Sequence, residues 1–266
     1  MRPASACVPL VLLLAGAAPP APNLTAVPDA GPYFALTFDA HAEMHGAREL
    51  LALLRERHIR ATIFVTGRFA ERHPELLREA MRDGHEIGNH TYSHPHLTTW
   101  AHNHRHDTLQ GVTRAMLQGE LERTERAVIA AAGKPPARLW RAPYGEHNAE
   151  IRGWAAELGY RHVDWTRANG DALDALDWVE DPRQRRYLGP EAMARRLLSF
   201  ERRTGVPLAG SIVLMHLGSS RPEPPLLEAL PIFLDETDHR GLHPVTVDGL
   251  LRRSRATPPA SAAASR

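Results

Sequence analysis

The chain has 266 residues, of which 43% are hydrophobic and 24% charged, a composition that suits one large domain or two small ones with a sizeable core. Its formal net charge is +1, which argues against a general nucleic-acid binder. Cys7 is the single cysteine, so a disulfide framework is excluded.

The first segment, residues 1–21, has the composition of a secretory signal peptide. A basic start at Arg2 is followed by a short apolar run and then by small residues. The run is too short to cross a bilayer comfortably, and a disordered Ala/Pro-rich start is the alternative interpretation. We therefore expect an exported chain, periplasmic or extracellular, without stable membrane insertion after cleavage. Removal of the segment would also remove Cys7, which excludes catalysis through a thiol.

Residues 22–32 are predicted to be a linker, residues 33–253 a single domain and residues 254–266 a disordered tail. Within the domain, short β-type runs alternate with helical patterns. Strands are predicted at residues 33–38, 61–65, 85–88, 138–141, 161–165, 211–216 and 242–246. Helices are predicted at residues 46–58, 69–82, 113–132, 148–158, 190–203 and 226–235, and residues 247–253 are expected to close the domain. About seven βα units indicate a parallel α/β fold, a distorted (β/α)7 barrel that is closed or nearly closed.

Polar residues follow the predicted strands at the ends where such barrels place their sites. They come from four strands along the chain: Asp39 after the first, His90 and His94 after the third, Arg141 at the end of the fourth and His216 at the end of the sixth. Scattered core polar residues would have no reason to gather at one rim. The sequence therefore predicts a site at this edge of the sheet.

His90 and His94 are four residues apart, about one helical turn, so a helical turn would point both imidazoles the same way. That is how a protein offers two nitrogens to one divalent metal. The spacing alone is weak evidence in a chain with sixteen histidines. A second histidine-rich run is interpreted as a solvated loop rather than a metal site: it contains His102, His104 and His106.

Five short segments occur in order: Thr37-Phe38-Asp39, residues 90–95 (His-Thr-Tyr-Ser-His-Pro), residues 141–145 (Arg-Ala-Pro-Tyr-Gly), residues 174–178 (Asp-Ala-Leu-Asp-Trp) and Leu214-Met215-His216. Together they resemble the motifs of the polysaccharide deacetylase family, also called the NodB-homology domain or carbohydrate esterase family 4. The resemblance covers roughly residues 33–250, and five motifs in register are a specific joint signal.

The resemblance implies an acid–base set around a divalent metal. Asp39 would be the general base, oriented by an ion pair to Arg141, and His216 the general acid. His90 and His94 would bind the metal, with zinc as the expected ion and cobalt, nickel or other divalent ions as alternatives.

Further residues would complete the site by the same resemblance. Asp174 is expected to support His216, with Asp171 and Asp177 competing for that role. Tyr144 is expected to offer its backbone N–H to the oxyanion. Leu214 is expected to wall the acetyl pocket. Independently of the resemblance, Trp178 and Trp140 are candidates for stacking on a sugar face and are equally plausible as core.

The chain departs from the family pattern at Ala40, where the family usually has a second acid that binds the metal. His41 is the expected replacement ligand by proximity, and Glu43, His45 or water are alternatives. Longer loops at residues 98–111, 167–173 and 177–188 are expected to shape substrate choice.

The sequence therefore predicts a monomeric, metal-dependent hydrolase that removes acetyl groups from N-acetylated amino sugars of a polysaccharide. Peptidoglycan is the first candidate, and chitin-type oligomers and O-acetylated glycans are alternatives. Ala40 favours a rival interpretation, a catalytically inactive glycan-binding module on the same fold. A metal-dependent hydrolase of small amides is the other rival.

Overall fold

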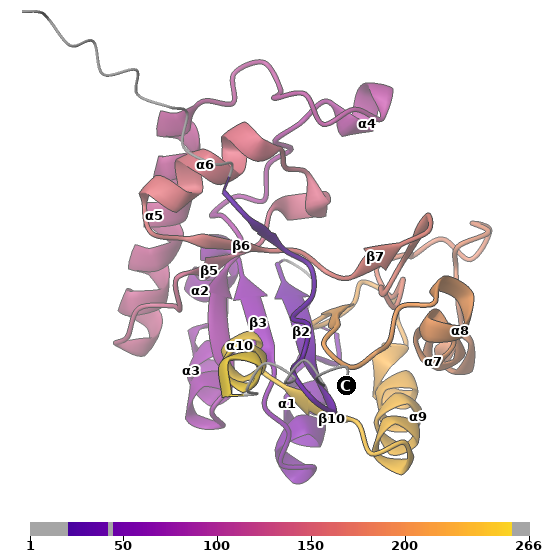
Figure 1. Ribbon diagram of the computed structural model, residues 1–266. Coiled ribbons are helices and arrows are strands. Elements are labelled where there is room, and N and C mark those ends of the chain that lie inside the picture. Colours follow the sequence, from indigo (N-terminus) through magenta and orange to yellow (C-terminus); the bar gives the residue numbers. More distant parts are fainter. Residues whose placement is uncertain (1–20, 42–44, 257–266) are drawn as a thin grey trace, which may run out of the picture.

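A computed structural model of the chain describes residues 21–41 and 45–256 (Figure 1). Its main element is a sheet of eight strands that all pair in parallel. The strands are β1 (Asn23–Leu24), β2 (Tyr33–Ala40), β3 (Thr62–Val65), β4 (Glu86–Asn89), β5 (Leu139–Trp140), β6 (Arg161–Val163), β9 (Ile212–His216) and β10 (His243–Val245). A separate antiparallel hairpin consists of β7 (Arg167–Ala168) and β8 (Asp171–Ala172).

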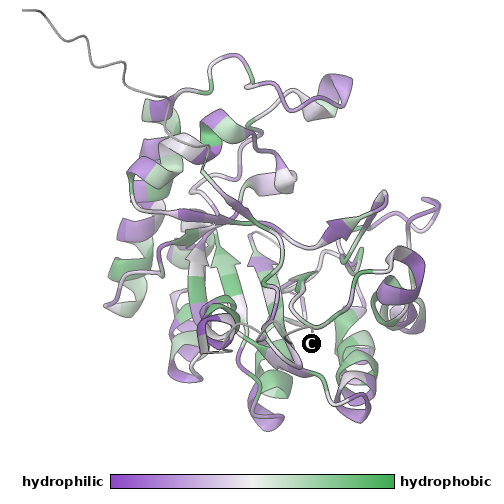
Figure 2. Ribbon diagram, in the orientation of Figure 1, coloured by the Kyte–Doolittle hydropathy of each residue, from purple (hydrophilic) through white to green (hydrophobic). Residues whose placement is uncertain are grey.

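Helices cover the outer face of the curled sheet (Figure 1). The described helices are α1 (Ala47–Glu56), α2 (Gly67–Arg72), α3 (Pro74–Arg82), α4 (Trp100–Asn103), α5 (Arg114–Ala132), the 3₁₀ turn η1 (Pro143–Gly145), α6 (Ala149–Glu157), α7 (Pro190–Leu198), α8 (Phe200–Thr204), α9 (Leu226–His239) and α10 (Val247–Ala256). The short helix α4 does not cover the sheet but projects away from it (Figure 1). Neighbouring helices pack side by side in the order α6, α5, α3, α1, α9 and α7. Their hydrophobic faces turn toward the sheet and their hydrophilic faces toward solvent (Figure 2).

The strand order β1-β6-β5-β4-β3-β2-β10 leaves β9 as a second partner of β2. Strand β10 pairs with residues 33–35 of β2, and β9 with residues 35–39. The segment after β6 returns to β9, because Thr166 N donates to Ile212 O at 3.0 Å and Leu214 N donates to Leu173 O at 3.0 Å. The sheet is therefore a curled half-barrel of parallel strands, as the alternation of strands and helices predicts.

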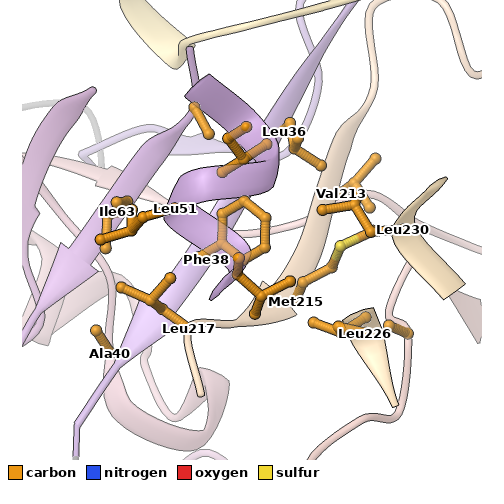
Figure 3. Packing of buried hydrophobic residues seen from close by; sticks show 14 of the residues in the cluster. Leu36, Phe38, Ala40, Leu51, Ile63, Val213, Met215, Leu217, Leu226 and Leu230 are labelled. Carbon is orange, nitrogen blue, oxygen red and sulfur yellow. The ribbon is translucent and has the colours of Figure 1, made fainter. Parts of the chain in front are cut away.

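Strand β2 shows how the sequence divides inside from outside. Its even-numbered positions, from Phe34 to Ala40, belong to the main hydrophobic cluster under the helices, whereas Thr37 and Asp39 alternate to the other face. Figure 3 shows side chains of β2, β9, α1 and α9 meeting in this cluster. The polar positions of the strand are thereby left for the concave side.

Two predicted helices are each divided in the structure. The one predicted at residues 69–82 is α2 and α3, separated at His73, because a residue before proline is disfavoured in helical conformation and Pro74 begins the next helix. The one predicted at residues 190–203 is α7 and α8, separated at Ser199. The segment at residues 167–173, expected to be a loop, forms the β7–β8 hairpin around an Asn169-Gly170 turn.

The predicted domain boundaries need two corrections. Residues 22–32 are not a linker, since Asn23 and Leu24 pair with β6 and Val27 N donates to Gly210 O at 2.7 Å; a two-residue strand has no periodicity that a sequence pattern reveals. The predicted tail begins too early, because α10 continues to Ala256.

The signal-peptide prediction, apart from residue 21, and the rest of the tail lie outside the described residues. Within residues 21–41 and 45–256, none of the helices combines the length and apolar character that a membrane span requires.

His162 joins three strands and makes the stability of the fold depend on pH. Its Nε2 accepts from Ala142 N at 3.2 Å, so Nδ1 carries the proton and donates to Asn23 Oδ1 at 2.7 Å. Burial, and next the neighbouring His147, lower the pKa of His162 well below its ordinary value. A second proton, on Nε2, would face the Ala142 N–H and break the hydrogen bond that Nε2 accepts from it.

Since the unfolded chain binds a proton at His162 near pH 6.5 and the folded chain does not, stability should fall as pH drops below that value. His162 contributes at most about 1.4 kcal/mol per pH unit to the slope of the unfolding free energy against pH. We expect His162→Gln to reduce the slope of the unfolding free energy between pH 7 and pH 5 by up to this amount, measured by urea unfolding. His239→Gln, which changes an exposed histidine of α9, should leave the slope unchanged. An equal slope in wild type and His162→Gln would contradict the prediction.

Candidate active site

The carboxyl ends of the parallel strands bring the predicted site residues to one edge. Asp39 of β2 lies directly opposite His216 of β9 in the strand register. His90 follows β4, and Arg141 continues from β5, where its N–H donates to Asn89 O at 2.9 Å. The acid and the histidine, 177 positions apart in the chain, are therefore neighbours in space.

Arg141 is completely buried and holds Asp39 in place. Its Nη1 donates to Asp39 Oδ1 at 2.8 Å, which is the predicted ion pair. Its remaining donors reach backbone carbonyls of the next strand, with Nε 3.1 Å from Val163 O and Nη2 3.3 Å from Asp164 O. One guanidinium thus connects β2, β5 and the end of β6.

The Asp39 carboxylate stays ionised although it is buried. Burial alone would raise its pKa, but the charge of Arg141, its hydrogen bond and the charge of the protonated His216 hold the pKa below its ordinary value. The second oxygen, Oδ2, lies 3.6 Å from His90 Nε2. A carboxylate in this state is suited to accept a proton.

His216 is held by Asp177, one of the two competing candidates, rather than by Asp174, which was expected first. Asp177 Oδ1 lies 3.0 Å from His216 Nδ1, and Oδ2 accepts the His216 backbone N–H at 2.8 Å. Asp174 instead accepts from Leu176 N at 2.7 Å and from the Trp178 indole at 3.2 Å. Leu176 adopts a left-handed φ of 61°, which turns the chain so that the later aspartate reaches the histidine.

Asp177 also sets the charge of His216. Burial alone would lower the pKa of His216, but the charge of Asp177 and its hydrogen bond outweigh burial and raise the pKa to about 9. The ring is then protonated at neutral pH, with Nδ1 donating to Asp177 and Nε2–H left to donate to another group. This is the state that a general acid requires.

Replacing Asp177 should therefore lower the pKa of His216. We expect Asp177→Asn to lower it by about one to three units, because an adjacent opposite charge shifts a pKa by that amount. An NMR titration of the His216 ring in the metal-free protein measures the change. Asp174→Asn is the matched control and should shift the pKa less, since Asp174 makes no hydrogen bond to the ring. A larger shift in Asp174→Asn than in Asp177→Asn would reverse the assignment.

His90 and His94 lie together, but not on the helical turn that their spacing suggests. Residues 90–97 form a loop in which Thr91 and His94 have left-handed φ values of 63° and 60°. The two ring centroids are nevertheless 4.9 Å apart. His90 Nδ1 lies 2.9 Å from Arg141 O, to which it donates, so Nε2 faces the site.

Glu120 of α5 shapes this loop, although no sequence pattern indicated the residue. Its carboxylate accepts from Tyr92 N at 2.8 Å, from Ser93 N at 2.7 Å and from Ser93 Oγ at 2.9 Å. Asn89 fixes the start of the loop by accepting from Thr91 N at 2.9 Å. The separation of the two imidazoles therefore depends on a carboxylate about thirty residues further along the chain.

Both imidazoles are suited to bind a cation because both are neutral. Burial lowers the pKa of His90 to about 4 and that of His94 to about 2. The His90 tautomer leaves Nε2 as a free acceptor, as a metal ligand requires. The two histidines thus fit a divalent cation, with Asp39 beside them.

The prediction of His41 as the third ligand is not supported by the geometry. The His41 ring is stacked on His94 with centroids 4.8 Å apart and planes only 27° from parallel. Lone pairs of imidazole nitrogens lie in the ring plane, so stacked rings direct them along separate lines. Across residues 21–41 and 45–256, no group of three His, Cys, Asp or Glu side chains is arranged to hold a metal ion. Glu43, an alternative ligand, lies outside these ranges, whereas the side chain of His45, another alternative, lies 3.3 Å from Arg221 O.

These residues open into a cavity of about 600 Å³. Its wall contains seven of the acid and imidazole residues described above: Asp39, His41, His90, His94, Asp174, Asp177 and His216. Leu214 lines it as predicted, whereas Trp140 does not. Trp140 is fully buried against His162 and belongs to the core, because its side chain alternates away from the rim.

Three large aromatic side chains stand exposed in the wall of the cavity. Trp100 is 42% exposed, Tyr144 54% and Trp178 43%. Tyr144 has a left-handed φ of 58° and stacks on His96, with ring centroids 4.2 Å apart. Of the three, only Trp100 is absent from the predicted site residues; it is the first residue of α4, directly before the histidine-rich run.

Comparison with known proteins identifies the family. Residues 26–163 match the family model described as polysaccharide deacetylase, so the chain belongs to that family. Membership places it among the polysaccharide deacetylases, the class of enzyme that its motifs predicted. A peptidoglycan-N-acetylglucosamine deacetylase of Bacillus cereus is 26% identical over 229 residues, which cover 85% of this chain and 72% of that protein.

Two further comparisons agree with this family assignment. A chitooligosaccharide deacetylase of Sinorhizobium fredii is 32% identical over 198 residues, covering 73% of this chain and 78% of that protein. The structure of Bacillus subtilis PdaA, a family 4 carbohydrate esterase, superposes with a TM-score of 0.68 at 25% identity, covering 86% of this chain and 84% of that chain. The predicted fold class, a single α/β domain built as a distorted parallel barrel, is confirmed, with the sheet curled into a half-barrel.

Proposed function

We propose that this protein is an exported, metal-dependent hydrolase that removes acetyl groups from N-acetylated amino sugars of a glycan, with peptidoglycan as the first candidate. The observation that carries the proposal is the pairing of Asp39 with Arg141 and of His216 with Asp177 on neighbouring strand ends. A protein that only binds glycan would not need such an acid–base set. The leader-like composition of residues 1–21 supports export.

The two paired groups have complementary roles. Asp39 accepts a proton from the water that attacks the acetyl carbonyl carbon. His216 gives its Nε2 proton to the amide nitrogen as the C–N bond breaks, which yields acetate and the free amino sugar. A divalent cation on His90 and His94, zinc first and cobalt or nickel next, would polarise the acetyl carbonyl and lower the pKa of the attacking water. Ala40 offers no ligand, and we propose that water completes the coordination.

The walls of the cavity support a sugar substrate. Trp100, Tyr144 and Trp178 present exposed rings on which sugar faces can stack. Leu214, which is 3% exposed, borders the reacting groups and suits the acetyl methyl. The relative from Bacillus cereus is named for peptidoglycan and the one from Sinorhizobium fredii for chitooligosaccharide. These names support a glycan substrate rather than a small amide.

The test is acetate release after the protein is stripped of metal and reloaded with zinc, cobalt, nickel or magnesium. N-acetylglucosamine oligomers, peptidoglycan fragments and small acetamides are compared as substrates. We expect release from at least one glycan that depends on the added cation. Glycan binding without acetate release under every cation would favour an inactive glycan-binding module. A preference for small acetamides would favour a metal-dependent hydrolase of small amides.

A further inference from the structure

A second cavity, of about 900 Å³, lies beside the catalytic one. The β7–β8 hairpin, residues 185–188 and α7 contribute its walls. The two cavities share three wall residues, Arg167, Ala172 and Arg186, so they adjoin one another. A glycan chain that enters the catalytic cavity would extend into this second space.

The second cavity is strongly basic. Its wall contains four arginines (Arg167, Arg185, Arg186 and Arg196), whereas Asp171 is the one acid among the described residues that line it. That acid is already neutralised, because its two carboxylate oxygens lie 2.7 Å from Arg196 and 2.7 Å from Arg203. The excess of positive charge is therefore not balanced within the wall.

Three of these guanidinium groups are available to a ligand. In the described part of the chain, no carboxylate lies within 4.0 Å of Arg185 or Arg186. Arg186 lies over the ring of Trp178, 5.0 Å from its centroid. Arg167 lies 4.1 Å from the centroid of Trp165 and only loosely pairs with Asp164 at 3.8 Å.

The hairpin that carries Arg167 is anchored rather than free. Asn169 at its turn donates to Thr204 O at 2.9 Å, and the Asp171 ion pairs tie its second strand to α7 and α8. One side of the cavity is therefore held in position before a ligand binds, which lowers the entropy cost of binding.

We propose that this cavity is a subsite for an anionic substituent, a carboxylate or a phosphate, on a sugar adjacent to the one that is deacetylated. Guanidinium groups form paired hydrogen bonds with the oxygens of both anions. The proposal rests on the proposed function, since it assigns the class of glycan that the same site prefers. Glycans with an acidic sugar would be better substrates than neutral ones of equal length.

The test compares kcat/KM for three oligosaccharides of equal length. One contains only N-acetylglucosamine, one alternates it with N-acetylmuramic acid, which carries a carboxylate, and one carries a phosphate monoester. We expect the wild type to prefer an anionic oligomer. The preference should fall about threefold in Arg185→Gln and about tenfold in Arg185→Gln/Arg186→Gln, because exposed charge pairs contribute little individually. It should also fall as salt is raised.

Arg183→Gln is the matched control. Arg183 is a close neighbour in the chain and 89% exposed, but it pairs with Asp181 and does not line the cavity. We expect it to keep the preference. A preference for only one of the two anionic oligomers would identify the substituent. An absent preference in wild type, or equal losses on neutral and anionic oligomers in the double variant, would overturn the subsite.

Calorimetric binding of the same oligomers separates this inference from the proposed function. Anion-dependent binding that requires Arg185, without acetate release from any oligomer, would reject the deacetylase and retain the subsite. Acetate release without anion-dependent binding would retain the deacetylase and reject the subsite.

Discussion

Asp39→Asn is expected to lower the kcat of acetate release by about 10³-fold, within the range that a general base contributes. Asparagine has the shape of aspartate but cannot take a proton from water at neutral pH. Its amide oxygen still accepts a hydrogen bond from Arg141 Nη1, which is 2.8 Å from Asp39 Oδ1 in the wild type. The variant should therefore bind glycan while releasing acetate very slowly. Initial rates at saturating glycan and cation measure the loss.

Asp235→Asn is the control for this substitution. Asp235 lies on α9, 59% exposed, and pairs with Arg57 far from the cavity, so its replacement should leave kcat unchanged. Circular dichroism and calorimetric glycan binding verify that the Asp39 variant is folded and competent to bind. More than a tenth of the wild-type kcat in a folded Asp39→Asn protein would remove this residue from the role of base.

The position of Asp39 opposite His216 could be predicted because it follows from local patterns. Each residue ends an apolar run that reads as a buried strand, and parallel strands end at one edge of a sheet. The register of β2 and β9 then places the two side by side. The position of Arg141 could be predicted for the same reason, because the residue directly follows a short strand.

Other parts of the site depend on contacts that no short pattern records. The choice between Asp174 and Asp177 depends on the left-handed turn at Leu176, which is an unusual conformation for a leucine. The loop that brings His90 to His94 depends on Glu120, which reads from sequence as an ordinary charge on a helix. Such residues become recognisable only when the backbone is known.

Arg141→Leu is expected to destabilise the protein by about 3–5 kcal/mol, because it leaves a buried carboxylate without its partner. Arg141 is wholly buried, and Asp39 is 5% exposed. The carbonyls of Val163 and Asp164 would also lose their donors. Urea unfolding measures the change. Arg195→Leu is the control: it removes an exposed ion pair of α7 with Glu191 and should change the unfolding free energy by less than about 1 kcal/mol.

A double variant separates the lost charge pair from lost packing. If the unpaired carboxylate causes most of the damage, Asp39→Asn/Arg141→Leu should be more stable than Arg141→Leu alone, since it contains no buried charge at this place. Arg141→Lys provides a milder test should the leucine variant fail to fold. An ammonium can pair with Asp39 but lacks the planar donors that reach both carbonyls, so we expect an intermediate loss of about 1–3 kcal/mol. Stability within 1 kcal/mol of wild type for the leucine variant would mean that this buried ion pair does not hold the strand ends together.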